Sequence, residues 1–177
     1  MRKHKRNLSH NRLLTAQMGE LTPVCVMEVL PGDTFRHRHR LLLRMSTLVR
    51  PVMHQLRISL HTFYVPNRIL WNEWEDFAVG VPDNAQQTRT IPTVTCDNGA
   101  LCDHMGIPDG YTGAAVAFPF YAYRLIYNEW YRDQELQTEL DIDDGSVDML
   151  SRAWERDYFT SCRPQPQKGS DITIPIA

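Results

Sequence analysis

The sequence predicts a mainly β fold that is interrupted by helical segments, and three stretches near its start carry this prediction. Residues 23–30 are nearly all apolar and end in a Pro-Gly-Asp turn, which indicates a buried strand. Residues 34–45 alternate with a period of two, and residues 55–65 alternate more clearly. Because the chain has 177 residues, we expect one domain, or part of one, with a real core.

The stretch 34–45 is predicted to be a strand with one cationic face. A period of two places the rings of Phe35, His37 and His39 on one side. The arginines then line the other side, and they are Arg36, Arg38, Arg40 and Arg44. A helix would spread these arginines around its surface, so a strand is the simpler interpretation.

A short amphipathic helix is predicted directly after the third strand. Asn67 is a residue type that caps helices, and the apolar residues that follow at helical spacing are Leu70, Trp74 and Phe77. Residues 80–113 are rich in Pro, Gly, Asp, Asn and Thr without a sustained period, so we expect a long irregular loop there.

Two further helices and a last extended segment are expected in the second half. Aromatic and apolar residues recur at helical spacing over about 120–134, and residues 149–158 are predicted to form a third helix. Residues 172–176 return to an extended, β-like pattern.

Charge is distributed unevenly along the chain. Residues 1–68 hold twelve Lys or Arg and three acidic residues, a net charge of +9, whereas residues 69–177 carry a net charge of -11. Six of the seven histidines lie in the basic part, so acidification would widen the difference. The first part therefore suits a polyanionic partner and the second does not.

Residues 1–12 are predicted to be a basic arm that binds nucleic acid. Clustered Lys and Arg release counterions from a phosphate backbone without reading its sequence. The arm residues that we expect to make such contacts are Arg2, Lys3, Lys5, Arg6 and Arg12. A weaker candidate is the row Arg36, Arg38 and Arg40, for which a solvated charged face is an equally good interpretation. Aromatic residues do not interleave with these cations, so contact would be electrostatic.

Neither catalysis nor a bound metal is expected. The chain has no nucleophile elbow, phosphate-binding glycine loop or HExxH motif, and no apolar run long enough to cross a bilayer. We expect the four cysteines to be reduced thiols. Three groups could be imagined as metal ligands, but their spacing is poor or ligands are missing. They are Cys96 and Cys102 with Asp103 and His104, the pair His37 and His39, and the acidic turn Asp141, Asp143 and Asp144.

Five segments, in order, resemble the major capsid proteins of microviruses, particularly the gokushovirus branch. They are Glu28–Phe35 (EVLPGDTF), Arg44-Met45 with Arg50-Pro51, Phe63–Trp71 (FYVPNRILW), Tyr123–Asp133 (YRLIYNEWYRD) and Asp157–Gly169 (DYFTSCRPQPQKG). The resemblance covers essentially the whole chain, from about residue 9 to residue 177.

The resemblance implies part of an eight-stranded antiparallel viral jelly roll with long, partly helical insertions. Residues 13–177 would be an incomplete jelly-roll domain, with its first strands within about 23–65 and an insertion over about 67–160. Members of the family are much longer, so we expect a fragment of a longer product. A shortened relative that borrows strands from another chain is the alternative.

The function that the resemblance implies is that of a structural subunit in the T=1 icosahedral shell of a single-stranded DNA bacteriophage. The expected partners are copies of the same chain, the packaged single-stranded DNA, and other virion or scaffolding proteins, with no membrane and no cofactor. The expected location is the virion, with the host cytoplasm during assembly. The alternative from another class is a nonviral, non-enzymatic nucleic-acid-binding module, which would bind DNA as a stable monomer.

Overall fold

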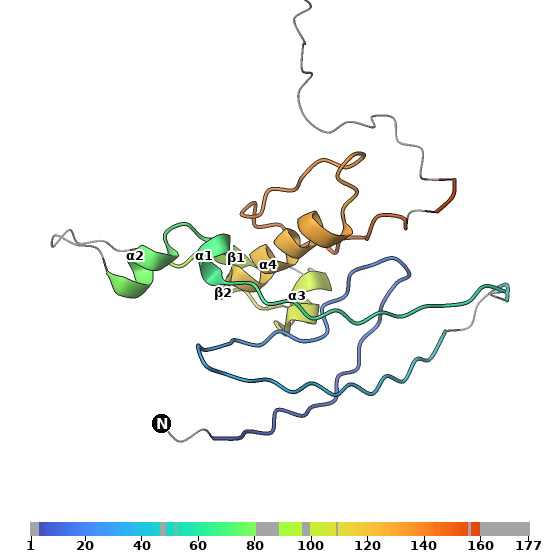
Figure 1. Cartoon of the computed structure of the whole chain (residues 1–177), viewed down its shortest axis with the longest axis horizontal. Coiled ribbons are helices and arrows are strands. Elements are labelled where there is room, and N and C mark those ends of the chain that lie inside the picture. The colour runs from blue at the N-terminus through green and yellow to red at the C-terminus, as the bar shows by residue number, and fades with distance from the viewer. Residues whose placement is uncertain are drawn as a thin grey trace, which may run out of the picture. The chain divides into compact units, whose positions relative to one another are not determined.

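The computed structural model describes residues 4–46, 49–51, 53–80, 89–96, 100–108, 110–155 and 157–159, and it divides the chain into two compact units (Figure 1). The first unit, Met1–Val26 with Val65–Ala177, contains every helix and strand that the structure describes, and we call it the helical unit. The second, Met27–Tyr64, is called the extended unit.

A two-stranded antiparallel sheet has its first strand within the stretch 80–113, where a long irregular loop was expected, and its second strand directly after that stretch. Strand β1 (Thr93–Thr95) pairs with β2 (Ala114–Val116), and helix α3 (Ala100–Met105) lies between them in the chain. The prediction of a loop over 80–113 was therefore wrong for β1 and α3. Strands of three residues are too short to show a period in the sequence, and their pairing depends on a partner that is distant in the chain.

The helix predicted after Pro66 is two short helices. Helix α1 (Asn67–Leu70) ends where Trp71 adopts an extended conformation, and α2 (Trp74–Val79) starts three residues later. Asn67 was wrongly predicted as the cap, because it is the first helical residue and Pro66 takes the cap position without a side-chain bond. Leu70 is buried, whereas the α2 aromatics stack near Trp71 and Phe118.

The second predicted helix is confirmed, and it changes type along its length. Helix α4 (Phe118–Ile126) starts with a proline in its first turn, where a missing N–H costs nothing. It continues as a π-helical turn, η1 (Tyr127–Tyr131), in which the N–H of Arg132 donates to the carbonyl of Tyr127 at 2.9 Å.

The core of the helical unit gathers around α4, the small sheet and α3. Ala117, Phe120 and Leu101 are its most enclosed members. The buried cluster consists of Leu70, Val94, Cys96, Leu101, Cys102, Ala117, Phe120, Tyr121 and Tyr123. Burial of such side chains contributes about 25 cal/mol per Å² of apolar surface, so this cluster is the main source of stability in the unit.

Tyr123 joins two distant segments to helix α4. Its hydroxyl donates to the carbonyl of Leu21 and accepts from the N–H of Leu150, both at 2.9 Å. Burial raises the pKa of Tyr123, which keeps the hydroxyl protonated for the donated bond. Leu21 also donates its own N–H to Leu150 at 2.9 Å. The N-terminal segment and the segment near residue 150 are therefore held together at the helix.

Asn128 holds a third segment in the same way. This residue is 1% exposed, and its amide donates to the carbonyl of Leu140 at 2.8 Å while accepting from the Leu140 N–H at 3.1 Å. Both polar groups of a loop residue are thus satisfied by one side chain.

The third helix, predicted over 149–158, was wrong for the residues that the structure describes there. Ser151 forms an isolated antiparallel bridge with Glu20, and the N–H of Arg152 donates to Gly19 at 2.8 Å. Pairing with the N-terminal segment uses the backbone groups that a helix would need. The extended segment expected at 172–176 lies outside the described residues.

The extended unit does not form the three expected hydrogen-bonded strands. All residues of 23–30, 34–45 and 55–65 are described, and none belongs to a strand. Figure 1 shows the chain running out along one extended arm and returning along another. The unit has no buried residue in its described part, so the alternating pattern indicates extended backbone whose ladder partners are not supplied here.

Replacing Asn128 with alanine should destabilise the chain by roughly 2–4 kcal/mol, because two buried backbone groups of Leu140 lose their partner. Chemical denaturation followed by tryptophan fluorescence measures the loss. The matched control is Asn72→Ala, at an exposed position, which should change stability by less than about 0.5 kcal/mol. Equal midpoints for the two variants would contradict the role given to Asn128.

Candidate nucleic-acid interface

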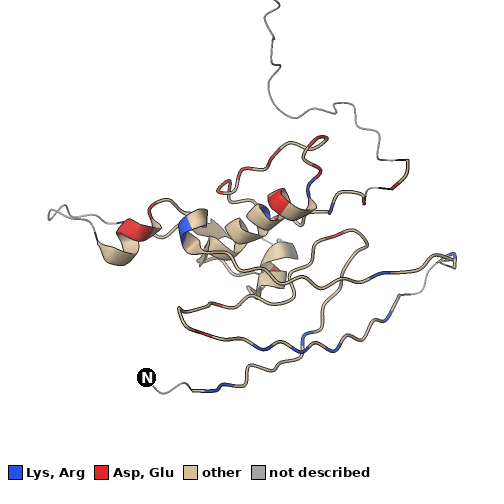
Figure 2. Cartoon of the chain, viewed as in Figure 1, with Lys and Arg blue, Asp and Glu red and all other residues tan. Residues whose placement is uncertain are grey.

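Three arginines form a regular cationic row on the extended unit. Arg36, Arg38 and Arg40 are exposed and occupy alternate positions of an extended segment; we call them the arginine ladder. No carboxylate in the described parts of the chain forms an ion pair with them. Figure 2 shows Lys and Arg positions following one another along this extended segment. Their charge is therefore available to an external anion.

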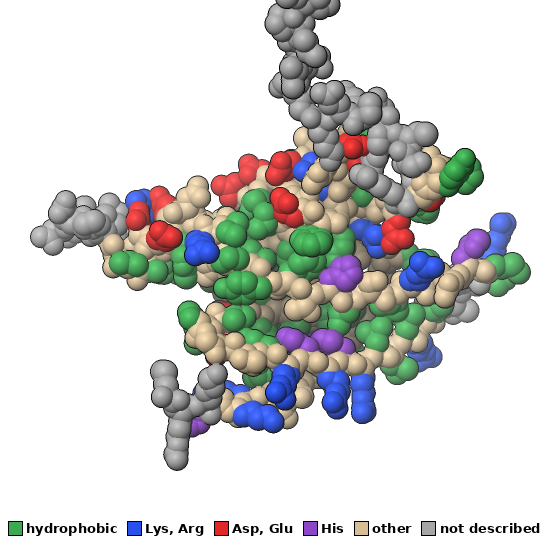
Figure 3. All heavy atoms as spheres, in the orientation of Figure 1, with side chains coloured by type: hydrophobic (Ala, Val, Ile, Leu, Met, Phe, Trp, Pro, Cys, Tyr) green, Lys and Arg blue, Asp and Glu red, His purple; other side chains and the backbone are tan. Residues whose placement is uncertain are grey.

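Stacked rings occupy the opposite side of the same segment. Phe35 and His37 have ring centroids 6.0 Å apart, and His37 and His39 are 5.8 Å apart, each pair with an interplanar angle of 11°. Figure 3 shows histidine side chains together on one side of this segment and Lys and Arg side chains projecting from the other side. The alternation predicted for 34–45 is thus confirmed for these side chains, even though no ladder of hydrogen bonds accompanies it.

The residues of the predicted basic arm differ in their surroundings. Lys5 and Arg6 are exposed, and Arg2 and Lys3 lie outside the described residues. Arg12 is half-buried, and its guanidinium donates to the carbonyls of Val24 at 2.9 Å and Asp103 at 3.2 Å, and also to that of His104. Among the predicted arm residues that the structure describes, only Lys5 and Arg6 are therefore exposed to solvent.

The anchoring of Arg12 was not foreseen from the sequence. Its guanidinium lies at the last turn of α3, where helix carbonyls have no partner within the helix and carry partial negative charge. No local pattern relates residue 12 to residues about ninety positions later, so no signal in the sequence could have revealed the contact.

The acidic loop after η1 is unsuited to nucleic acid. Residues 133–151 contain seven acidic residues and no Lys or Arg, and red segments mark this loop in Figure 2. The hydrogen bond that protonated Asp143 donates to Asp141, together with the nearby charge of Asp141, raises the pKa of Asp143. No group of three potential metal ligands occurs among the residues that the structure describes, including this loop and the histidine pair.

One acid of this loop has a structural partner. Asp144 forms an ion pair at 2.8 Å with Arg124, whose side chain is 7% exposed, and the same guanidinium donates to the carbonyl of Asp141. The hydrogen bond from Arg124 holds the pKa of Asp144 below its ordinary value. The turn is therefore not merely solvated, because it neutralises a buried cation.

Cys96 and Cys102 form a disulfide, so the expectation of reduced thiols was wrong for this pair. The chain path from β1 into α3 brings their Cα atoms to 6.0 Å, within the range that a disulfide needs. Closing so short a loop contributes about 2 kcal/mol in the chain-entropy description. Cys25 is free and exposed, and Cys162 lies outside the described residues.

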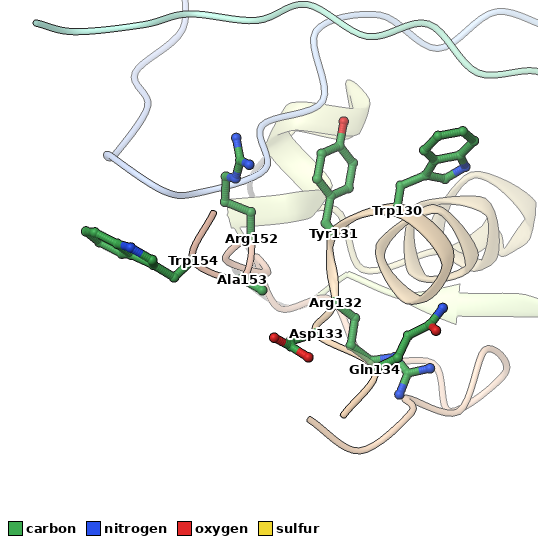
Figure 4. A pocket seen from close by; sticks show the side chains of 8 residues that line it. All are labelled: Trp130, Tyr131, Arg132, Asp133, Gln134, Arg152, Ala153 and Trp154. Carbon is green, nitrogen blue, oxygen red and sulfur yellow. The ribbon is translucent and has the colours of Figure 1, made fainter. Parts of the chain in front are cut away.

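A small pocket of about 190 Å³ lies where η1 meets the segment around Ala153. Figure 4 shows two exposed indoles at its borders, Trp130 and Trp154, with Tyr131 between η1 and Arg152. Arg152 forms an ion pair with Glu155 at 3.0 Å, and Asp133 also lines the pocket. This mixture of charges does not favour phosphate. The sequence had placed no candidate site here.

Within the described residues, no helix combines the length and the apolar character that crossing a bilayer requires.

Comparison with known proteins gives matches along the whole chain. Residues 1–177 match the family described as "Capsid protein (F protein)". "Capsid protein VP1" of Bdellovibrio phage phiMH2K is 37% identical over 97% of this chain and 35% of its own length. The protein of the same name from Chlamydia phage 1 is 34% identical over 95% of this chain and 34% of its own length.

A third relative agrees with these matches. "Capsid protein VP1" of Spiroplasma virus 4 is 30% identical over 97% of this chain and 36% of its own length. The chain thus spans about a third of the length of the curated relatives that it matches. The resemblance to microvirus major capsid proteins, inferred from five segments, is confirmed.

Replacing Asp144 with asparagine should lower stability by about 1 kcal/mol at pH 7, because buried Arg124 loses its charged partner. The pKa of Asp144 is lowered in the folded chain, so its contribution is present above its ordinary value of 3.8 and is lost as the pH falls through the lowered value. The difference between variant and parent should therefore persist from pH 7 to about pH 4 and shrink below it.

Denaturation midpoints measured across this pH range test the prediction. The control is Glu129→Gln, which makes the same charge change at an exposed helical position. A difference for Asp144→Asn that stayed constant down to pH 2 would contradict the ion pair as its cause.

Proposed function

Because the chain belongs to the capsid protein (F protein) family, we propose that it forms part of a structural subunit in the icosahedral T=1 shell of a small single-stranded DNA bacteriophage. The observation that carries this proposal is the family match over residues 1–177, together with relatives that are themselves named capsid proteins. Such a subunit would function through its contact surfaces, without a catalytic centre.

The extended unit is proposed to supply strands to an eight-stranded antiparallel jelly roll. Apolar side chains at alternate positions support this, since Leu56, Ile58 and Leu60 are all exposed in the unit as described. A row of this kind on extended backbone is typical of a strand whose inner face and edge are covered by other strands. The partner strands would come from sequence outside residues 1–177 or from a neighbouring subunit.

Contact with the packaged DNA is proposed for the arginine ladder and for the exposed arm residues Lys5 and Arg6. These side chains are exposed to solvent, and they form no ion pair with any carboxylate that the structure describes. Exposed, unpaired cations can bind phosphates and release the counterions of the DNA. Arg2 and Lys3 are included because they belong to the same basic stretch of the sequence as Lys5 and Arg6. We assign Arg12 a structural role, because three backbone carbonyls already satisfy its guanidinium.

The proposed partners follow from this role. They are further copies of the subunit, single-stranded DNA, and other virion or scaffolding proteins, with the virion as location and the host cytoplasm as the place of assembly. A monomeric nucleic-acid-binding module is the competing function, and it differs in predicting DNA binding without assembly.

Replacing Arg36, Arg38 and Arg40 together with glutamine should weaken binding to a single-stranded oligonucleotide roughly tenfold or more. The slope of log affinity against log salt should fall by about 2, at roughly 0.7 per lost phosphate contact. Fluorescence anisotropy over a salt series measures both quantities.

Two controls separate the ladder from charge in general. Replacing the same residues with lysine keeps the charge and should largely keep the slope. Neutralising Arg50, Arg57 and Arg68, which are exposed and lie outside the cationic face of residues 34–45, removes as much charge and should have a smaller effect. If the two neutral variants lost affinity equally, the ladder would have no special part in binding.

Self-association is the second expected behaviour. The chain should form species larger than a monomer, and added single-stranded DNA should increase their size, because neutralised cations no longer repel one another. Sedimentation velocity with and without the oligonucleotide measures this. A chain that remained monomeric while binding DNA would favour the competing function.

A further inference from the structure

The disulfide Cys96–Cys102 lies inside the core of the helical unit. Cys96 directly follows β1, and Cys102 is in the middle of α3; each is 3% exposed and belongs to the buried cluster. Leu101, at 1% exposed, packs beside them. The bond therefore joins the sheet to the helix from within.

Helix α3 depends on such ties. It has six residues, fewer than two turns, and isolated helices of that length do not persist in water. Beyond the burial of Leu101, its described ties include the disulfide at Cys102 and the bonds that Arg12 donates to its last turn. Its C-terminal end is closed by hydrogen bonds from the Ile107 N–H to the Cys102 carbonyl at 2.9 Å and from the Gly106 N–H to the Asp103 carbonyl at 3.0 Å. The disulfide is the covalent tie among these, and it joins the helix to the residue that follows β1.

The last turn of α3 binds Arg12, the last residue of the basic arm. The guanidinium of Arg12 donates to the carbonyls of Asp103 and His104, which directly follow Cys102. Arg12 can keep these bonds only while the last turn of α3 stays in place. A continuous series of contacts thus runs from the disulfide through one helical turn to the last residue of the arm.

We propose that the Cys96–Cys102 pair is a redox-sensitive site that controls whether the basic arm is anchored at Arg12. In the disulfide state α3 is fixed and Arg12 is bound. In the dithiol state α3 loosens and Arg12 loses the carbonyls of Asp103 and His104, which leaves Val24 as its remaining partner. The charge of Arg12 then becomes available beside those of Lys5 and Arg6. The use of that longer cationic segment for DNA rests on the proposed function, whereas the release itself does not.

The chemistry is a thiol–disulfide exchange. With glutathione disulfide as oxidant, the two cysteine thiols lose two protons and two electrons to form the Cys96–Cys102 bond, and two molecules of glutathione are released. Dithiothreitol reverses the step and becomes its own cyclic disulfide. A reducing cell and an oxidising exterior would favour the dithiol and the disulfide respectively.

Trypsin digestion of the full 177-residue chain tests the proposal, because Arg12 is itself a cleavage site. The chain is equilibrated with glutathione disulfide or with dithiothreitol, and its redox state is verified by mass. Mass spectrometry then follows cleavage after Arg12 with time. Reduction should accelerate this cleavage about tenfold or more, since an anchored segment is cleaved only on opening. Cleavage after exposed Lys5 and Arg6 should change less than about twofold.

Three variants and one internal site make the result specific. The double variant Cys96→Ser with Cys102→Ser should be cleaved quickly after Arg12 under both conditions, whereas Cys25→Ser should behave as the parent. Arg12→Lys keeps the charge and the cleavage site but cannot reproduce the fork of hydrogen bonds, so it should be cleaved quickly even when oxidised. Cleavage after buried Arg124 reports general unfolding.

Equal rates after Arg12 in the verified oxidised and reduced chains would overturn the proposal. So would a rise at Arg124 that matched the rise at Arg12, because reduction would then unfold the unit instead of releasing the arm. Oligonucleotide binding is measured in both redox states as a separate readout. Absence of binding in both would count against the proposed function and leave the protease result intact.

Discussion

The helical unit depends on hydrogen bonds from two side chains of a single helical run to distant backbone. Tyr123 joins Leu21 to Leu150, and Asn128 satisfies both polar groups of Leu140. The segments that they hold have little regular structure of their own, so a backbone ladder cannot position them. Hydrophobic burial draws these segments toward α4, but it has no direction; the buried polar contacts determine which residues meet.

Elements that show a pattern within one stretch of sequence were predicted correctly, whereas contacts between distant parts of the chain were not. The α4 region was recognised because its aromatic residues recur at helical spacing within a single window. The strand pair β1 and β2 was missed, since three residues show no period. The helix predicted over 149–158 was wrong for its described residues, of which 150–152 pair with residues 19–21. Alternation in the extended unit predicted strands, but none of those residues belongs to one, because a hydrogen-bonded ladder also requires a partner.

The same difference between local patterns and distant contacts holds for the candidate interface. The position of the arginine ladder and its separation from the rings of His37 and His39 follow from a period of two, so the sequence was sufficient. Arg12 looked like its neighbours Lys5 and Arg6, and nothing in its local sequence showed that it would meet the end of α3. The disulfide was missed for a related reason, because cysteine spacing alone does not reveal Cα separation.

The π-helical turn gives η1 an unusual tolerance for the loss of one residue. A ring closed between Tyr127 and Arg132 holds one residue more than an α-helical ring. Removal of one residue within this turn would let the run close as ordinary α-helix and would leave the direction of the chain after it nearly unchanged. The same loss within α4 would rotate everything after it by about 100°. The hydrogen bond from the Ala153 N–H to the Tyr131 carbonyl depends on that direction, so single-residue deletions should be inherited more readily in this turn than in α4.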